Sequence, residues 1–123
     1  MADILVVDDD LLVLDVVGRL LEQVGHKVWR MGNVRDARAL LAGGSRIDVA
    51  IIDLVLRDAP GIELIKHIRA DYPSLPVVVI SGYITPESTQ ILSTLASLGV
   101  KHALAKPIDR QALLDAVAQA TAH

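Results

Sequence analysis

The aliphatic run at residues 4–7, followed at once by Asp8, Asp9 and Asp10, constrains the fold more than any other segment of the chain. Four consecutive aliphatic residues indicate a strand buried on both faces, which is typical of a parallel sheet covered by helices on both sides. Ligands of open α/β sheets bind at the carboxyl ends of the strands, so acids at that point predict a site for a cation or a phosphate. Asp10, next to Leu11, is instead expected to cap the following helix.

Short aliphatic runs alternate along the chain with longer amphipathic segments, which is the pattern of repeated βαβ units. The expected strands are residues 3–8, 27–31, 47–52, 76–80 and 100–105, and the expected helices are residues 11–24, 33–41, 62–70, 86–98 and 110 to near the end. The second strand is the most polar and is placed at a sheet edge, whereas the fourth is aliphatic throughout and is placed centrally. The sequence therefore predicts one α/β domain over residues 1–123, built as a doubly wound parallel sheet.

Residues at the helix ends fit this assignment. Asn33, with an acid three positions on, resembles a capping box; Thr85 followed by Pro86 is expected to begin the fourth helix, and Asp109 the fifth. The positions expected to face the core are Leu12, Val16, Val17, Leu20, Leu21 and Val24 in the first helix, and Ile91, Leu92, Leu95 and Leu98 in the fourth. After Glu87 the fourth helix carries no charge. Its outer face is either an uncharged solvent-exposed face or, with the last strand and helix, a surface for a protein partner, an output domain or a second copy of the chain.

Composition excludes several classes of protein. The 123 residues suffice for a domain that buries roughly two-thirds of its unfolded surface, and the core must be aliphatic because the chain has no Phe. A net charge of −3 without a basic run argues against nucleic acid or an anionic membrane as the main partner. There is no Cys and the four His are scattered, so a zinc or copper site is not expected. The lack of Cys, of an apolar leader and of a stretch of ~20 apolar residues favours a cytoplasmic chain.

Polar side chains follow four of the expected strands. They are Asp8 and Asp9 after the first strand, Asp53 after the third, Ser81 after the fourth and Lys106 after the fifth. Because parallel strands end at the same edge, these side chains are expected to meet. Two carboxylates about 4 Å apart repel by about 4 kcal/mol at an effective dielectric constant near 20, so three of them require protons or a cation. Magnesium suits this donor set, since it accepts oxygen ligands and commonly binds through one or two carboxylates plus phosphate oxygens.

Together, these motifs resemble the receiver domain of bacterial two-component response regulators. The residues that carry the resemblance are 4–9, Asp53 with Gly61 eight positions later, Ser81-Gly82 and Lys106-Pro107. The resemblance covers nearly the whole chain. It implies a flavodoxin-like (βα)5 fold with the strand order 2-1-3-4-5, and a role in phosphorelay signalling.

The resemblance also implies roles for the acidic residues. Asp53 would be the nucleophile that accepts a phosphoryl group from the phosphohistidine of a histidine kinase or a histidine phosphotransfer protein. A Mg²⁺ or Mn²⁺ ion would be held by Asp9, Asp53 and the main-chain carbonyl of Val55, with Asp8 acting mainly through a bound water. The module would catalyse its own phosphorylation and dephosphorylation rather than turn over a substrate.

The remaining site residues would contact the phosphoryl group itself. Lys106 would pair with one phosphoryl oxygen, and the hydroxyl of Ser81 would donate to another. Gly82 would leave room for the incoming group.

The chain departs from the receiver pattern at positions that relay and time the signal. Ala103 stands three residues before the site lysine, where receivers commonly have Tyr or Phe. Signal transfer is therefore expected to run through movement of Ser81 and the loop after it, with Tyr83 filling the space; the alternative is that Tyr83 is an ordinary loop residue. Val55 and Tyr83 flank the site and should hinder an attacking water, which predicts a long-lived phosphoryl group. Arg57 stands where the family often has Pro, so its loop is expected to follow an unusual path.

Other functions fit the sequence less well. Magnesium-dependent phosphohydrolases with an Asp nucleophile carry a second Asp two residues later, where this chain has Val55. A nucleotide-binding domain would show a G-x-G-x-x-G or Walker loop after the first strand. A receiver-like module that acts by partner binding without phosphorylation stays open, as does whether the chain is a single-domain regulator or part of a longer protein.

Overall fold

Five parallel strands form one sheet in the order β2-β1-β3-β4-β5, which confirms the strand order that the resemblance implied. The computed structural model describes residues 1–85 and 87–122. The elements are β1 Asp3–Val7, α1 Leu11–Gln23, β2 Lys27–Met31, α2 Val34–Ala42, β3 Val49–Asp53, α3 Gly61–Asp71, β4 Val77–Ser81, α4 Thr89–Ser97, β5 His102–Ala105 and α5 Arg110–Ala120.

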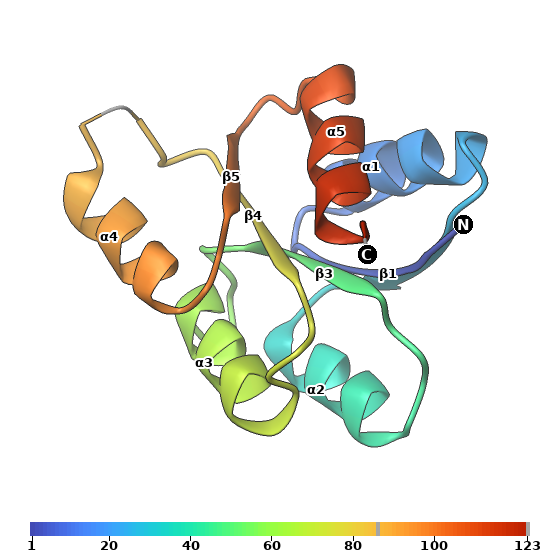
Figure 1. Ribbon diagram of the computed structural model, residues 1–123, viewed down its shortest axis with the longest axis horizontal. Coiled ribbons are helices and arrows are strands. Elements are labelled where there is room, and N and C mark those ends of the chain that lie inside the picture. Colours follow the sequence, from blue (N-terminus) through green and yellow to red (C-terminus); the bar gives the residue numbers. More distant parts are fainter. Residues whose placement is uncertain (86, 123) are drawn as a thin grey trace.

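Helices cover both faces of this sheet, with α1 and α5 on one side and α2, α3 and α4 on the other (Figure 1). Successive residues of a strand point to opposite faces, so each strand supplies both layers. Ile4, Val6, Ile51 and Ile80 belong to the core beneath α1 and α5, whereas Leu5, Val7, Ile52 and Val79 belong to the core beneath the other helices. The continuous aliphatic runs in the sequence reflect this burial on two sides.

The expected core-facing stripe of α1 is wrong in part. Leu12, Val16 and Val24 are exposed, whereas Val17 and Leu21 are buried as expected, together with Leu14 and Gly18. The first turns of α1 offer two overlapping apolar stripes, and a helix can turn only one stripe of roughly 100° toward the sheet. The buried stripe includes Gly18, whose missing side chain leaves room for the guanidinium of Arg30 to cross the helix and pair with Glu22.

The expected start of α4 is also wrong. The helix begins at Thr89 after Ser88, three residues later than a cap at Thr85 would place it; Pro86 lies outside the described residues. The amide of Thr85 donates to the Ser88 hydroxyl at 3.1 Å, and the Ser88 amide donates to the Thr85 carbonyl at 3.0 Å. These contacts close a turn where the sequence suggested a helix. Ile91, expected in the core, is 37% exposed, while Leu95 is buried.

The other predicted caps are confirmed. Asp10 accepts a hydrogen bond from the amide of Leu12 at 2.9 Å, and Asp109 accepts one from Ala112 at 2.8 Å. Asn33 accepts one from the amide of Asp36 at 2.7 Å, as a capping residue of α2 should. Asp10 is therefore a cap rather than a member of the acidic cluster.

Candidate functional site

The register of the sheet brings the predicted polar residues to one edge. Val7 of β1 lies opposite Ile52 of β3, so Asp8 and Asp53 follow at the same level. Ser81 at the end of β4 lies opposite Ala105, which places Lys106 one residue beyond. Segments separated by up to about a hundred residues in sequence thus converge, because parallel strands share their carboxyl edge.

The alternation of side chains decides which of these residues meet. Asp8 continues the series Ile4 and Val6, and Asp53 continues Ile51, so both point to the side of α1 and α5. Lys106 follows Leu104 on the same side. Ser81 follows Val77 and Val79 on the opposite face of β4. Accordingly, its hydroxyl forms no hydrogen bond with Asp53 in the described part of the chain.

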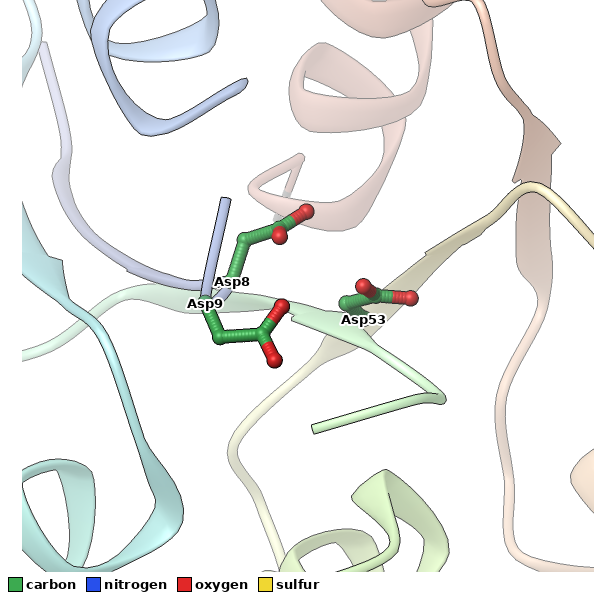
Figure 2. Close-up of side chains that lie close together, drawn as sticks. All are labelled: Asp8, Asp9 and Asp53. Carbon is green, nitrogen blue, oxygen red and sulfur yellow. The ribbon is translucent and has the colours of Figure 1, made fainter. Parts of the chain in front are cut away.

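Three carboxylates form a compact cluster at this edge (Figure 2). One oxygen from each of Asp8, Asp9 and Asp53 lies within 4.8 Å of the others. Asp8 is fully buried, Asp53 is 4% exposed and Asp9 is half-buried. The sequence prediction that these three acids converge is therefore correct in its placement.

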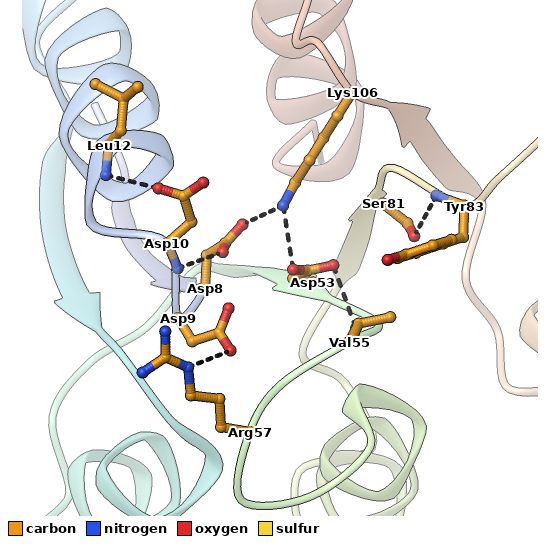
Figure 3. A network of polar contacts seen from close by, with 10 residues as sticks. All are labelled: Asp8, Asp9, Asp10, Leu12, Asp53, Val55, Arg57, Ser81, Tyr83 and Lys106. Carbon is orange, nitrogen blue, oxygen red and sulfur yellow. Dashed lines mark hydrogen bonds and ion pairs between the residues drawn. The ribbon is translucent and has the colours of Figure 1, made fainter.

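Lys106 neutralises part of this cluster. Its Nζ lies 2.8 Å from Asp8 Oδ2 and 3.1 Å from Asp53 Oδ2, and it donates a hydrogen bond to Asp53. The contact with Asp8 is short but poorly aligned, so we treat it as an ion pair; Asp8 Oδ2 accepts no hydrogen bond from any described residue. Figure 3 shows the lysine reaching down from the end of β5 between the two carboxylates.

Burial and the neighbouring charges have opposite effects on the pKa values of Asp8 and Lys106. Burial raises the pKa of Asp8 above its ordinary value, more than the nearby Lys106 lowers it. Burial by itself would lower the pKa of Lys106, but the nearby carboxylates of Asp8 and Asp53 outweigh it and raise that pKa. The lysine therefore stays charged, while the deepest carboxylate is held at a free-energy cost that a further cation would relieve.

The loop after β3 orients Asp53 from the other side. The amide of Val55 donates to Asp53 Oδ1 at 3.3 Å, and the Val55 side chain is half exposed. Gly61 begins α3 directly against this strand end, with its amide bonded to the Leu54 carbonyl at 2.9 Å. A Cβ at Gly61 would overlap the carbonyl oxygen of Asp53. The glycine eight residues after Asp53 is thus required by close backbone approach.

The loop after β4 presents Ser81, Gly82 and Tyr83 beside the cluster. The Ser81 hydroxyl is buried and accepts a hydrogen bond from the amide of Tyr83 at 3.1 Å. A Cβ at Gly82 would meet no atom within 4 Å, so this position is open. The ring of Tyr83 is 71% exposed and in Figure 3 projects toward Asp53 and Val55. Ala103 is half-buried against the core beneath α3 and α4.

Two contacts at the site were missed from the sequence. Arg57 Nε lies 3.5 Å from Asp9 Oδ2, so the residue noted as a departure from the receiver pattern pairs with an acid of the cluster. Asp58 accepts hydrogen bonds from the amides of Val34 and Arg35, which fastens the loop after Asp53 to the start of α2. Both contacts join residues more than twenty positions apart, and no local pattern predicts them.

The arrangement fits a hard divalent cation. All side-chain donors are carboxylate oxygens, which are the ligands that Mg²⁺ and Mn²⁺ accept. The buried Asp8 Oδ2 without a hydrogen-bond donor among the described residues is the kind of atom that a bound cation or its water would satisfy. Asp8, Asp9 and Asp53 are the residues that could hold the ion.

Comparison with known proteins agrees with this geometry. Residues 4–118 match the model of the response regulator receiver domain, and the chain belongs to that family. It is 33% identical over 120 residues to the DNA-binding transcriptional regulator NtrC of Azospirillum brasilense, covering 97% of this chain and 24% of that protein. The structure resembles the chemotaxis protein CheY4 of Vibrio cholerae, with a TM-score of 0.84, 28% identity and 98% of each chain covered. A receiver domain from Clostridium thermocellum matches with a TM-score of 0.87 at 25% identity, over 98% of this chain and 94% of that one.

Family membership establishes the class of function. Receiver domains of two-component response regulators act in phosphorelay signalling, bind Mg²⁺ at an acidic pocket and are signalling modules rather than turnover enzymes. The phosphohydrolase alternative is therefore set aside. The chain spans only 24% of NtrC of Azospirillum brasilense and 28% of a cyclic di-GMP phosphodiesterase of Thermotoga maritima, so the activities of those whole proteins are not assigned to it. None of the helices in the described part of the chain has the length and apolar character needed to cross a bilayer.

Proposed function

We propose that this receiver accepts a phosphoryl group on Asp53, in a reaction that requires Mg²⁺ or Mn²⁺ at Asp8, Asp9, Asp53 and the Val55 carbonyl. The observation that carries the proposal is the convergence of three carboxylates and one lysine at the edge of the sheet. Three carboxylates against the charge of Lys106 leave two negative charges. A divalent cation neutralises them, which removes the repulsion of an anionic phosphoryl donor.

In the proposed step an oxygen of Asp53 attacks the phosphorus of a phosphohistidine. A P–O bond forms as the P–N bond breaks, and the leaving imidazole takes up a proton. Bound metal supplies charge neutralisation at the phosphoryl oxygens. Lys106 holds the orientation of Asp53 and pairs with a phosphoryl oxygen, the Ser81 hydroxyl turns from the Tyr83 amide to donate to another, and Gly82 gives the group room.

Incubation with acetyl phosphate and Mg²⁺, followed by intact mass measurement, tests the proposal. We expect the wild type to gain one phosphoryl group, and to lose that gain when the metal is chelated. Asp53→Ala should gain none, whereas the control Asp115→Ala, which changes an exposed acid of α5, should behave as the wild type. An unmodified wild type, or a phosphorylated Asp53→Ala, would overturn the assignment and favour a module that acts through partner binding alone.

Tyr83→Ala is expected to shorten the lifetime of the phosphoryl group several-fold. The proposed reason is that the Tyr83 ring, together with Val55, limits the approach of water to Asp53. The decay of the phosphorylated mass after removal of the donor measures this lifetime. Val24→Ala, at an exposed apolar position at the end of α1 away from the site, serves as the control. Equal decay in all three proteins would show that the ring does not shield the group.

The proposed partners follow from the same role. The donor would be a histidine kinase or a histidine phosphotransfer protein, in the cytoplasm. The outer surface of α4, β5 and α5 is the proposed place for an output domain, a protein partner or a second copy of the chain. Direct contact with nucleic acid or membrane is not part of the proposal. With Ala103 in place of an aromatic residue, we propose that phosphorylation reaches this surface through movement of Ser81 and the loop that carries Tyr83.

A further inference from the structure

One cationic side chain beside the acidic cluster has no part in the proposed phosphoryl transfer. Arg57 Nε lies 3.5 Å from Asp9 Oδ2, in the loop between β3 and α3 (Figure 3). Lys106 already pairs with Asp8 and Asp53, so Asp9 is the acid of the cluster whose charge faces Arg57. Each carboxylate thus has a positively charged neighbour before any metal arrives.

The position of Arg57 is set by its neighbour in sequence. Asp58 accepts hydrogen bonds from the amides of Val34 at 3.0 Å and Arg35 at 3.1 Å, at the start of α2. These backbone hydrogen bonds lower the pKa of Asp58, so its carboxylate remains ionised at neutral pH and keeps the loop attached to α2. The backbone at Arg57 is therefore held close to Asp9, while its side chain can still move.

The ion pair has the properties of a displaceable contact. The Arg57 side chain is 87% exposed and that of Asp9 is 23% exposed. Exposed ion pairs of this kind contribute little to stability, because water screens the charges and fixing a long side chain in one conformation costs entropy. A divalent cation bound by Asp9 would repel the guanidinium of Arg57. It would also attract the Asp9 carboxylate more strongly than the singly charged guanidinium does.

We infer that Arg57 competes with the divalent cation for Asp9 and thereby sets the metal affinity of the site. The inference rests on the proposed function, because it takes the three aspartates as the metal site. Binding of the ion displaces Arg57 toward the open groove lined by Asp9, Arg35 and Arg57 between the starts of α1 and α2. Half-occupancy of the site then requires a higher metal concentration than it would without Arg57.

Calorimetric titration of Mg²⁺ into the metal-free protein tests the inference with a matched control. Arg35 lines the same groove, and its side chain forms no ion pair among the described residues, so Arg35→Gln removes an equal charge without freeing Asp9. Arg57→Gln should bind Mg²⁺ about two- to fivefold more tightly than Arg35→Gln, as expected for the loss of an exposed ion pair. Equal affinities of the two variants would overturn the inference, because only net charge would then matter.

A second measurement follows Arg57 directly. The NMR resonance of its Nε–H group in the wild type should shift during the Mg²⁺ titration with the same midpoint as the binding curve. A resonance that does not move would also overturn the inference. Absence of any Mg²⁺ binding to the wild type is a different result, because it would remove the proposed metal site itself and not only the competition.

Discussion

Lys106→Ala is expected to lower the free energy of unfolding by about 3 kcal/mol at pH 7 in the absence of metal. The variant leaves Asp8 fully buried and Asp53 nearly so, with no lysine between them. The value is at the lower end of the range for breaking a buried ion pair, since the Lys106 side chain is itself 21% exposed. Denaturant unfolding at fixed pH measures the loss, and Lys101→Ala, at an exposed lysine just before β5, is the control.

The same variant should show a characteristic dependence on pH. The folded-state pKa of Asp8 is already raised by burial, and loss of the lysine removes a group that lowers it. A carboxyl group with a raised folded pKa favours folding fully at pH values below its unfolded pKa of 3.8, and this contribution is lost as the pH rises through the folded pKa. The deficit of Lys106→Ala should therefore shrink on acidification. A deficit that is constant with pH would indicate lost packing of the lysine stem rather than lost charge.

Gly61→Ala is expected to destabilise the protein by about 2–3 kcal/mol and to slow phosphorylation. The added Cβ would overlap the carbonyl oxygen of Asp53 and lie 2.8 Å from the Cα of Leu54. Both are backbone atoms, so neither can rotate away, and either α3 or the end of β3 must shift. A displacement of about 1 Å at a reacting group can cost about 100-fold in rate.

Gly32→Ala is the matched control, because a Cβ at Gly32 would meet no atom within 4 Å. Denaturant unfolding and the rate of phosphorylation by acetyl phosphate are compared for the three proteins. Stability and rate equal to the wild type in Gly61→Ala would show that α3 can retreat without moving Asp53. In that case the glycine would matter only for the start of the helix.

Local sequence patterns predicted most of the fold. The aliphatic runs that became β1, β3 and β4 are buried on both faces, and a parallel sheet is the structure that requires this. The expected α4 start failed because Thr85 and Ser88 close a turn, and the helix begins only after Ser88. The expected face of α1 failed because two apolar stripes overlap, and docking on the sheet selected between them.

Some features of the candidate site could likewise be predicted from the sequence, and others could not. Asp8, Asp53 and Lys106 could be brought together from the sequence alone, because each follows a strand and parallel strands end at one edge. The pairing of Lys106 with both acids depends on side-chain alternation and register, which only the folded sheet defines. The contacts of Arg57 with Asp9 and of Asp58 with α2 depend on the path of one loop.

The sequence by itself determined the succession of strands and helices along the chain and which polar residues stand at the carboxyl ends of the strands. These features follow from local periodicity and from the burial of both faces of a parallel sheet. Only the tertiary structure decided which carboxylate faces which cation and which apolar stripe of α1 is buried. Those outcomes depend on the relative positions of segments more than twenty residues apart, which no local pattern of residues encodes.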